Sequence, residues 1–220
     1  MAHDTTGRTT RRRLGVIGGT FDPVHFGHLG IAEEARGQFA LETVVFVPAA
    51  SPPHKGGKTF ASAEDRLEMV KLAISGNPHF IASDIEMRRG GPSYTIDTLD
   101  EISGMDAEAR IYFIVGADSL AELYQWHRAK ELVARFDFII VGRPGDEGPA
   151  RANSSRATLE GLAGSFGREA AEKLWKGFLQ EKPYNISATE IRARVAAGKS
   201  IRYLVPHEVE RYIVKRGLYA

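Results

Sequence analysis

The residues best suited to chemistry lie in one short segment, Gly18-Gly-Thr-Phe-Asp-Pro-Val-His-Phe-Gly-His28. Its glycines would let a phosphate approach the backbone closely, and a helix that follows would point free N–H groups and a positive dipole end at the anion. His25 and His28 are three residues apart, so both rings can face one ligand from the first helical turn. The segment therefore predicts a site where two imidazoles donate hydrogen bonds to a reacting phosphate.

Other phosphate-binding motifs do not fit this segment. It lacks the Gly-Lys-Ser/Thr ending of a Walker A loop and the Gly-x-Gly-x-x-Gly of a dinucleotide-binding fold. A metal site at His25 and His28 would need a third ligand at a suitable spacing, and none stands out nearby. Two alternatives stay open for the histidines, which are a metal site and a purely structural helix cap.

These residues need a fold that brings the end of a strand to the start of a helix. Short apolar segments typical of buried strands occur at 13–18, 43–48, 80–85, 110–115 and 136–141. Helical patterns or capping residues lie between or after them, at 28–40, from Ser62 through Ile74, at 94–102, at 187–195 and between Pro206 and Gly217. This alternation predicts an α/β fold with a doubly wound, Rossmann-like parallel sheet, in which ligands bind beyond the carboxyl ends of the strands.

The remaining segments are harder to interpret. Residues 1–12 are basic and rich in threonine, and we expect a disordered tail there, followed by one domain at 13–220. A targeting peptide is the open alternative for this tail. Glycine, proline and serine between 142 and 155 predict an exposed loop, and one or two helices are expected at 156–182.

Composition limits the class of protein. With 220 residues, of which 43% are hydrophobic, the chain can bury a sizeable core. A net charge of +1 argues against a protein that coats nucleic acid, and no apolar run reaches the roughly 20 residues of a membrane span. The absence of cysteine excludes disulfides, thiolate metal sites and a cysteine nucleophile. We therefore expect a cytoplasmic protein with no nucleic-acid or membrane partner.

Further motifs follow the histidine segment in a fixed order. They are Pro52-Pro-His-Lys55, Gly91-Pro-Ser-Tyr-Thr95, Ile114-Val-Gly-Ala-Asp118, Trp126, Gly142-Arg-Pro144, Ile186-Ser-Ala-Thr-Glu-Ile-Arg192 and Tyr203-Leu-Val-Pro206. Together they resemble the nicotinate-mononucleotide adenylyltransferases of the H-x-x-H nucleotidyltransferase superfamily, over nearly the whole chain from Leu14. The resemblance implies a nucleotidyltransferase domain that transfers the adenylyl group of ATP to nicotinate mononucleotide in NAD synthesis.

The resemblance also implies where ATP binds. His25, His28 and Arg192 would be the catalytic residues and would hold the triphosphate during transfer. The implied ATP-binding residues are Gly18, Gly19, Thr20, Phe21, His25, His28, Gly116, Asp118, Ile186, Ser187, Thr189 and Arg192. Asp118 would accept hydrogen bonds from ribose hydroxyls, and the helix that begins near Ser187 would bind the β- and γ-phosphates. The residues alone also allow Asp118 to be a helix N-cap, and 187–190 to be an ordinary capping box beside a surface arginine.

For the acceptor, the resemblance implies a phosphate-binding lysine and an aromatic pocket. The implied acceptor-binding residues are Lys55, Tyr94, Thr95, Trp126, His127 and Arg143. Trp126 would stack on the pyridine ring, while backbone N–H groups near Thr95 and His127 would receive the nicotinate carboxylate. A role for Trp126 as partly buried packing stays open.

The implied reaction is an in-line attack of the acceptor phosphate on ATP, with no general base and no covalent intermediate. Mg²⁺ should accompany the triphosphate, held largely by phosphate and water and without dedicated protein ligands. The rival functions are adenylation of nicotinamide mononucleotide or phosphopantetheine, and nucleotide sensing without turnover. Two features depart from the family pattern. Ala188 replaces a usual serine, which puts one phosphate contact in doubt, and the stretch at 145–182 is longer than usual.

Overall fold

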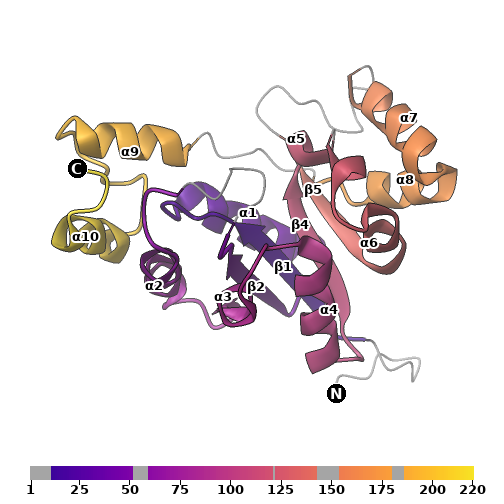
Figure 1. Cartoon of the computed structure of the whole chain (residues 1–220), viewed down its shortest axis with the longest axis horizontal. Helices are drawn as coiled ribbons and strands as arrows, with labels where there is room; N and C mark the ends of the chain where they lie inside the picture. The colour runs from indigo at the N-terminus through magenta and orange to yellow at the C-terminus, as the bar shows by residue number, and fades with distance from the viewer. Residues whose placement is uncertain (1–10, 52–58, 121, 143–153, 180–185) are drawn as a thin grey trace.

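Five parallel strands form the centre of the computed structural model (Figure 1), which describes residues 11–51, 59–120, 122–142, 154–179 and 186–220. In chain order they are β1 (Arg13–Gly19), β2 (Thr43–Pro48), β3 (Phe80–Ala82), β4 (Arg110–Gly116) and β5 (Asp137–Val141). Their order across the sheet is β3-β2-β1-β4-β5, so the chain winds outward from β1 in one direction and then in the other. The predicted doubly wound α/β fold is confirmed.

Helices cover both faces of the sheet, and this explains why the strands are almost continuously apolar. One core contains Ile17 of β1 and Phe46 of β2, while their neighbours Val16 and Val45 belong to the other. The first core receives buried residues from α1 (Phe26–Gln38), α2 (Ala63–Ile74), α9 (Ala188–Ala196) and α10 (His207–Arg216). The second receives them from α4 (Thr95–Met105), α6 (Ala129–Arg135), α7 (Ser154–Phe166) and α8 (Arg168–Lys176).

Four of the five predicted strands lie within one residue of their observed bounds, and the segment at 80–85 is the exception. There β3 ends at Ala82, and a short helix, α3 (Ile85–Arg89), begins where the strand was expected to end. The Ser83 N–H donates to the Phe46 carbonyl at 2.9 Å, which completes the pairing with β2. Asp84 then occupies the N-cap position, and the helix buries Ile85 completely.

The helix after β1 begins two residues earlier than predicted and also ends earlier. His25 has an extended backbone, with φ −149° and ψ 171°, and this makes it the N-cap residue and Phe26 the first helical residue. For α2, the predicted N-cap is confirmed, because the Ser62 hydroxyl accepts the Asp65 N–H at 3.0 Å. The predicted end of the last helix is also confirmed, because Gly217 follows α10 in the left-handed region, at φ 62°.

One or two helices were expected at 156–182, and two are present, α7 and α8, of which α7 begins slightly earlier, at Ser154. The segment that follows them protects the edge of the sheet. After α8 the chain runs beside β5, where Ile140 donates to the Gly177 carbonyl at 2.8 Å and Leu179 donates to the Ile140 carbonyl at 2.9 Å. A Cβ on Gly177 would lie only 1.9 Å from the Phe138 carbonyl oxygen, so only glycine fits there. This segment therefore provides hydrogen-bond partners for backbone groups of the edge strand β5 that would otherwise be unpaired. Within the described ranges, no helix combines the length and the apolar character needed to cross a membrane.

Candidate functional site

The predicted phosphate-binding turn joins the carboxyl end of β1 to α1, next to the middle of the sheet (Figure 1). Phe21 adopts a positive φ of 49°, a conformation that costs a bulky residue roughly 1 kcal/mol or more. Its ring is buried, with the Phe46 ring 5.9 Å away. A Cβ on Gly19 would lie 3.2 Å from this ring. Burial of Phe21 therefore sets the shape of the turn, and Gly19 makes room for it.

Asp22 ties this turn to two distant parts of the chain. Its side chain is 4% exposed, and its carboxylate accepts the backbone N–H groups of Phe60 at 2.7 Å and Ala61 at 3.1 Å. The hydroxyl of Tyr219 donates to the same carboxylate at 2.7 Å. Burial and the adjacent carboxylate raise the pKa of Tyr219 far above its ordinary value, so its hydroxyl remains a donor.

Arg66 is buried against the turn and stabilises it. The side chain is 1% exposed, and it donates to the Thr20 carbonyl at 2.8 Å. Asp22, Arg66 and Tyr219 were not predicted as site residues from the sequence. Only Asp22 carried a signal, because it lies inside the histidine segment. Arg66 has the pattern of a surface residue on an amphipathic helix, and Tyr219 stands far from every motif.

The two predicted histidines meet at the start of α1. Their rings stack with centroids 3.7 Å apart and planes inclined by 23°, and the His28 ring also contacts Phe21 at 5.0 Å. The backbone N–H of His25 donates to Nδ1 of His28 at 3.3 Å. Because Nδ1 accepts this N–H, the proton of a neutral His28 ring lies on Nε2. The structure thus supports His28 as an Nε2–H donor.

His25 lies deeper than His28, with 6% of its surface exposed. Burial lowers the pKa of His25 to about 4, so the ring is neutral near pH 7. Its Nδ1 has no hydrogen-bond partner among the described residues. A Cβ on Gly27 would lie 2.9 Å from this Nδ1, and glycine is therefore the residue that lets the ring lie against the helix.

Arg192 reaches the same turn from α9. Its Nη1 donates to the Asp22 carbonyl at 2.7 Å, and its Nη2 donates to the Thr189 hydroxyl at 3.2 Å. Ile186, just before α9, lies beside Gly27, because a Cβ on that glycine would be 3.6 Å from the Ile186 Cβ. The structure thus brings the predicted 186–192 motif to the two histidines.

The predicted capping box at the start of α9 does not form. Ser187 occupies the N-cap position, but its side chain makes no capping hydrogen bond. Glu190, which would complete the box, is exposed and lies 3.9 Å from Arg194 on the next turn. Glu190 therefore pairs along the helix instead of reaching back to its N-terminus.

Gly116 and Asp118 lie where β4 ends and a short helix, α5 (Ala117–Leu120), begins. This is the carboxyl edge of the sheet, next to the end of β1, as the sequence predicted. Asp118 is the second residue of α5 and not the residue before it, so the helix N-cap interpretation is wrong. The structure does not describe the side chain of Asp118.

Four of the six predicted acceptor residues come from two segments that the fold brings together. The Tyr94 and His127 rings stack, with centroids 4.4 Å apart. Thr95 is the first residue of α4, while Trp126 follows a 3₁₀ helix, η2 (Leu123–Gln125), and its partly buried ring meets Phe113 edge to face at 6.1 Å. Lys55 and Arg143 lie outside the described residues.

Ser93 is a further residue of this region that was not predicted from the sequence. Its hydroxyl accepts the backbone N–H groups of Ala50 and Ser51, each at 3.1 Å. It thereby joins the segment after β2 to the segment that carries Tyr94. The signal was present, because Ser93 lies within the motif at 91–95, but the resemblance assigned it no role.

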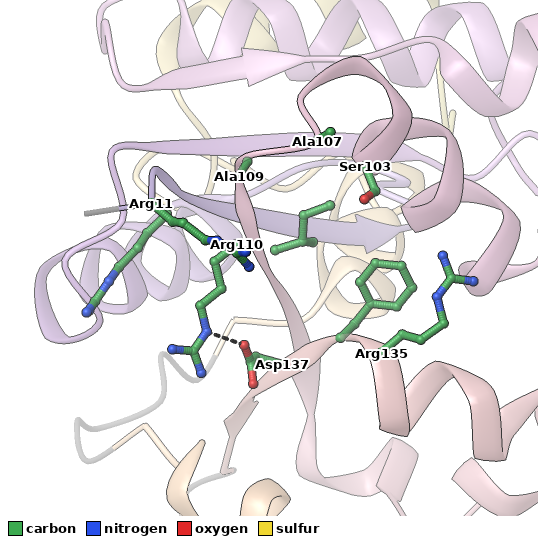
Figure 2. Close-up of a pocket in the computed structure, with 10 residues that line it drawn as sticks. Arg11, Ser103, Ala107, Ala109, Arg110, Arg135 and Asp137 are labelled. Atoms are coloured by element: carbon green, nitrogen blue, oxygen red, sulfur yellow. Dashed lines mark hydrogen bonds and ion pairs between the residues drawn. The ribbon is translucent and has the colours of Figure 1, made fainter. Parts of the chain in front are cut away.

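A separate hollow of about 510 Å³ lies at the opposite end of the strands (Figure 2). Its lining includes four arginines, Arg11, Arg13, Arg110 and Arg135. Two of these are already paired, Arg110 with Asp137 at 2.5 Å and Arg135 with Asp100 at 2.5 Å. Because ligands of doubly wound sheets bind at the carboxyl ends of the strands, this hollow is not the candidate site.

This chain is similar to known proteins over most of its length. The family described as Cytidylyltransferase-like matches residues 16–194. A probable nicotinate-nucleotide adenylyltransferase from Desulfitobacterium hafniense (strain Y51) is 44% identical over 209 residues, covering 94% of this chain and 96% of the relative. One from Saccharopolyspora erythraea is 43% identical over 209 residues, covering 95% of this chain and 90% of the relative.

A solved structure shows the same fold. Plasmodium falciparum nicotinic acid mononucleotide adenylyltransferase, complexed with NaAD, superposes with a TM-score of 0.71 at 18% identity and covers 94% of this chain and 97% of its own. The match to these curated relatives, at 43–44% identity over 94–95% of this chain, leads to one conclusion. This chain belongs to the nicotinate-nucleotide adenylyltransferase family.

Proposed function

We propose that this protein transfers the adenylyl group of ATP to nicotinate mononucleotide, giving nicotinate adenine dinucleotide and pyrophosphate in cytoplasmic NAD synthesis. A curated relative that is 44% identical to this chain is named for this activity. One observation in the structure supports it above the others. Arg192 donates to the carbonyl of Asp22 across 170 positions of sequence, in the turn that leads to His25 and His28. His25, His28 and Arg192, which we propose as the residues that hold the triphosphate, therefore lie around one turn at the end of β1.

The reaction would be an in-line displacement at the α-phosphorus of ATP. An oxygen of the acceptor's 5′-phosphate forms the new bond while the bond to the bridging oxygen of the β-phosphate breaks, and pyrophosphate leaves. This attacking oxygen is already anionic, so no general base is needed. The Nε2–H of His28 and the guanidinium of Arg192 would stabilise charge on the transferring and leaving phosphates, and the turn would position them.

Mg²⁺ is the cofactor that we propose for this reaction, bound together with ATP. It would neutralise part of the triphosphate charge, and oxygen atoms of phosphate and water would supply most of its ligands. Among the described residues, no group of three or more histidine, aspartate or glutamate side chains is arranged to hold a metal ion. The protein's own contribution would be to hold the phosphates.

One experiment tests the proposed function directly. The protein is incubated with ATP, Mg²⁺ and one acceptor at a time, namely nicotinate mononucleotide, nicotinamide mononucleotide or phosphopantetheine, and the product is identified by mass. Nicotinate adenine dinucleotide with stoichiometric pyrophosphate is the expected product. A preference for another acceptor would replace the proposed substrate, and ATP binding without pyrophosphate release would indicate a nucleotide sensor.

Replacement of Trp126 by alanine should raise the KM for nicotinate mononucleotide by roughly tenfold, because stacking on an aromatic side chain is worth about 1–3 kcal/mol. The KM for ATP should hardly change. Steady-state kinetics with each substrate varied in turn provides the measurement. Trp175→Ala is the matched control, because that ring packs on Phe178 in another part of the fold and should affect neither KM. If Trp126→Ala raises both KM values alike, Trp126 contributes to the packing of the fold and does not bind the acceptor.

Removal of the Asp118 carboxylate should weaken ATP binding by roughly fivefold, the effect of one lost hydrogen bond of about 1 kcal/mol. Binding of the acceptor should change much less, since the proposed contact is to the ribose of ATP. Separate titrations of Asp118→Ala with each substrate make the comparison. An equal loss of affinity for both would show that the residue acts on the structure of the strand end and not on the ribose.

A further inference from the structure

An exposed phenylalanine lies against the arginine of the proposed phosphate site. Phe60 is 72% exposed, and its ring centroid lies 4.2 Å from the guanidinium carbon of Arg192. A ring this exposed gains little from burial, so the hydrophobic effect does not explain its place. Attraction between a cation and the face of an aromatic ring does explain it, because 4.2 Å is well inside the range of that interaction.

The backbone of Phe60 is firmly held in this position. Its N–H donates to Oδ2 of Asp22 at 2.7 Å, and the N–H of Ala61 donates to Oδ1 at 3.1 Å. Ala61 itself is buried in the first core. Because the Asp22 carboxylate is also buried, these hydrogen bonds are well shielded from water and fix where the ring begins.

Asp22 also positions Arg192, the other partner in the contact with Phe60. Its carbonyl oxygen accepts from Nη1 of Arg192 at 2.7 Å, while the Thr189 hydroxyl accepts from Nη2 at 3.2 Å. Hydrogen bonds to Nη1 and Nη2 lie near the guanidinium plane and fix the position of the group, while Phe60 covers one face and limits its tilt. Within the described part of the chain, no ion pair neutralises Arg192, and its charge is available to a bound anion.

We propose that Phe60 is a positioning residue for nucleotide binding, because its ring holds the Arg192 guanidinium in the orientation that binds the polyphosphate of ATP. A planar, preoriented guanidinium loses less conformational freedom when it binds a phosphate, so affinity rises without any contact between Phe60 and the ligand. This inference rests on the proposed function only in taking ATP as the ligand of Arg192.

The test is calorimetric titration with a non-hydrolysable ATP analogue. Phe60→Leu keeps an apolar side chain but removes the ring, and it should weaken binding roughly fivefold, as expected for loss of a partly exposed cation–π contact. Phe60→Tyr keeps the ring and should restore the affinity. The control is Met105→Ala at the end of α4, where the side chain is 64% exposed, and this variant should bind like wild type. Unchanged binding in Phe60→Leu would overturn the proposal.

A double-mutant cycle separates positioning from direct contact. In an Arg192→Gln background, Phe60→Leu should cause no further loss, because the guanidinium that it orients is gone. If the fivefold loss persists there, Phe60 touches the nucleotide itself and the positioning role is wrong. The proposed function is judged separately by product formation in wild type, and a wild type that makes no dinucleotide but shows this binding pattern would overturn only that function.

Discussion

Replacement of His28 by alanine should lower kcat by roughly a hundredfold or more, as expected when one preorganised donor to a transition-state charge is removed. The structure gives this donor its direction. The His25 N–H donates to Nδ1 at 3.3 Å, which places the ring proton on Nε2. Stacking on the His25 ring and an edge-on contact with the Phe21 ring fix the plane of the His28 ring. The KM values should change much less than kcat, because the donor acts most strongly on charge that develops during transfer.

The fold of His28→Ala should remain intact, because the His28 side chain is only partly buried and lies in the first turn of α1. Circular dichroism and thermal melting check this before kinetics are interpreted. The matched control is His79→Ala at the start of β3, where an exposed histidine lies with Nδ1 3.1 Å from the Glu42 carbonyl, at the opposite end of the strands. Near-normal turnover by a folded His28→Ala protein would refute the catalytic role.

The stability of the protein should fall between pH 7 and pH 5 because of His25. Burial lowers the pKa of His25 from 6.5 to about 4, so between these values the unfolded chain binds a proton that the folded protein does not. The free energy of unfolding therefore falls as the pH falls from about 6.5 toward 4. Above pH 7 the His25 ring is neutral in both states, so the residue causes no loss of stability there. The loss due to this one residue should be about 2 kcal/mol at pH 5.

Urea unfolding of wild type and His25→Asn at pH 7 and pH 5 isolates this contribution. Other groups titrate over the same range in both proteins, so the informative quantity is the difference between their two pH dependences. The free energy of unfolding of wild type should fall by about 2 kcal/mol more than that of the variant. Parallel pH dependences would show that the pKa of His25 is the same in the folded and unfolded protein, so the ring would be protonated in the folded protein at pH 5 and the lowered pKa would be wrong.

Local sequence was sufficient for most of the sheet and for part of the site. Val16 and Ile17 belong to opposite cores, and a strand buried on both faces must be apolar at successive positions, so the strands could be predicted from residue type alone. The pair His25 and His28 could be predicted because their contact depends only on the geometry of one helical turn. The short helix α3 was missed, since its apolar first residue extends the pattern of β3.

Contacts between distant segments were beyond prediction from single residues. An arginine on a helix is normally solvated, yet Arg66 is buried beneath the turn because the Thr20 carbonyl needs a donor there. Tyr219 and Phe60 reach Asp22 from far along the chain, and nothing in their neighbouring residues indicates this. The family resemblance placed Arg192 at the site, whereas the residues around it slightly favoured a surface arginine beside an ordinary capping box.

The sequence by itself determined the α/β class, the strand positions, the histidine pair and, through its ordered motifs, the family. These properties depend on short-range periodicity and on residue types at fixed spacing, which a linear chain displays directly. Only the tertiary structure decided that Asp22 would join Phe60, Tyr219 and Arg192, and that burial would keep His25 neutral. The orientation of a guanidinium and the pKa of an imidazole depend on which groups surround them in space, and in this fold those groups come from segments that are far apart in the chain.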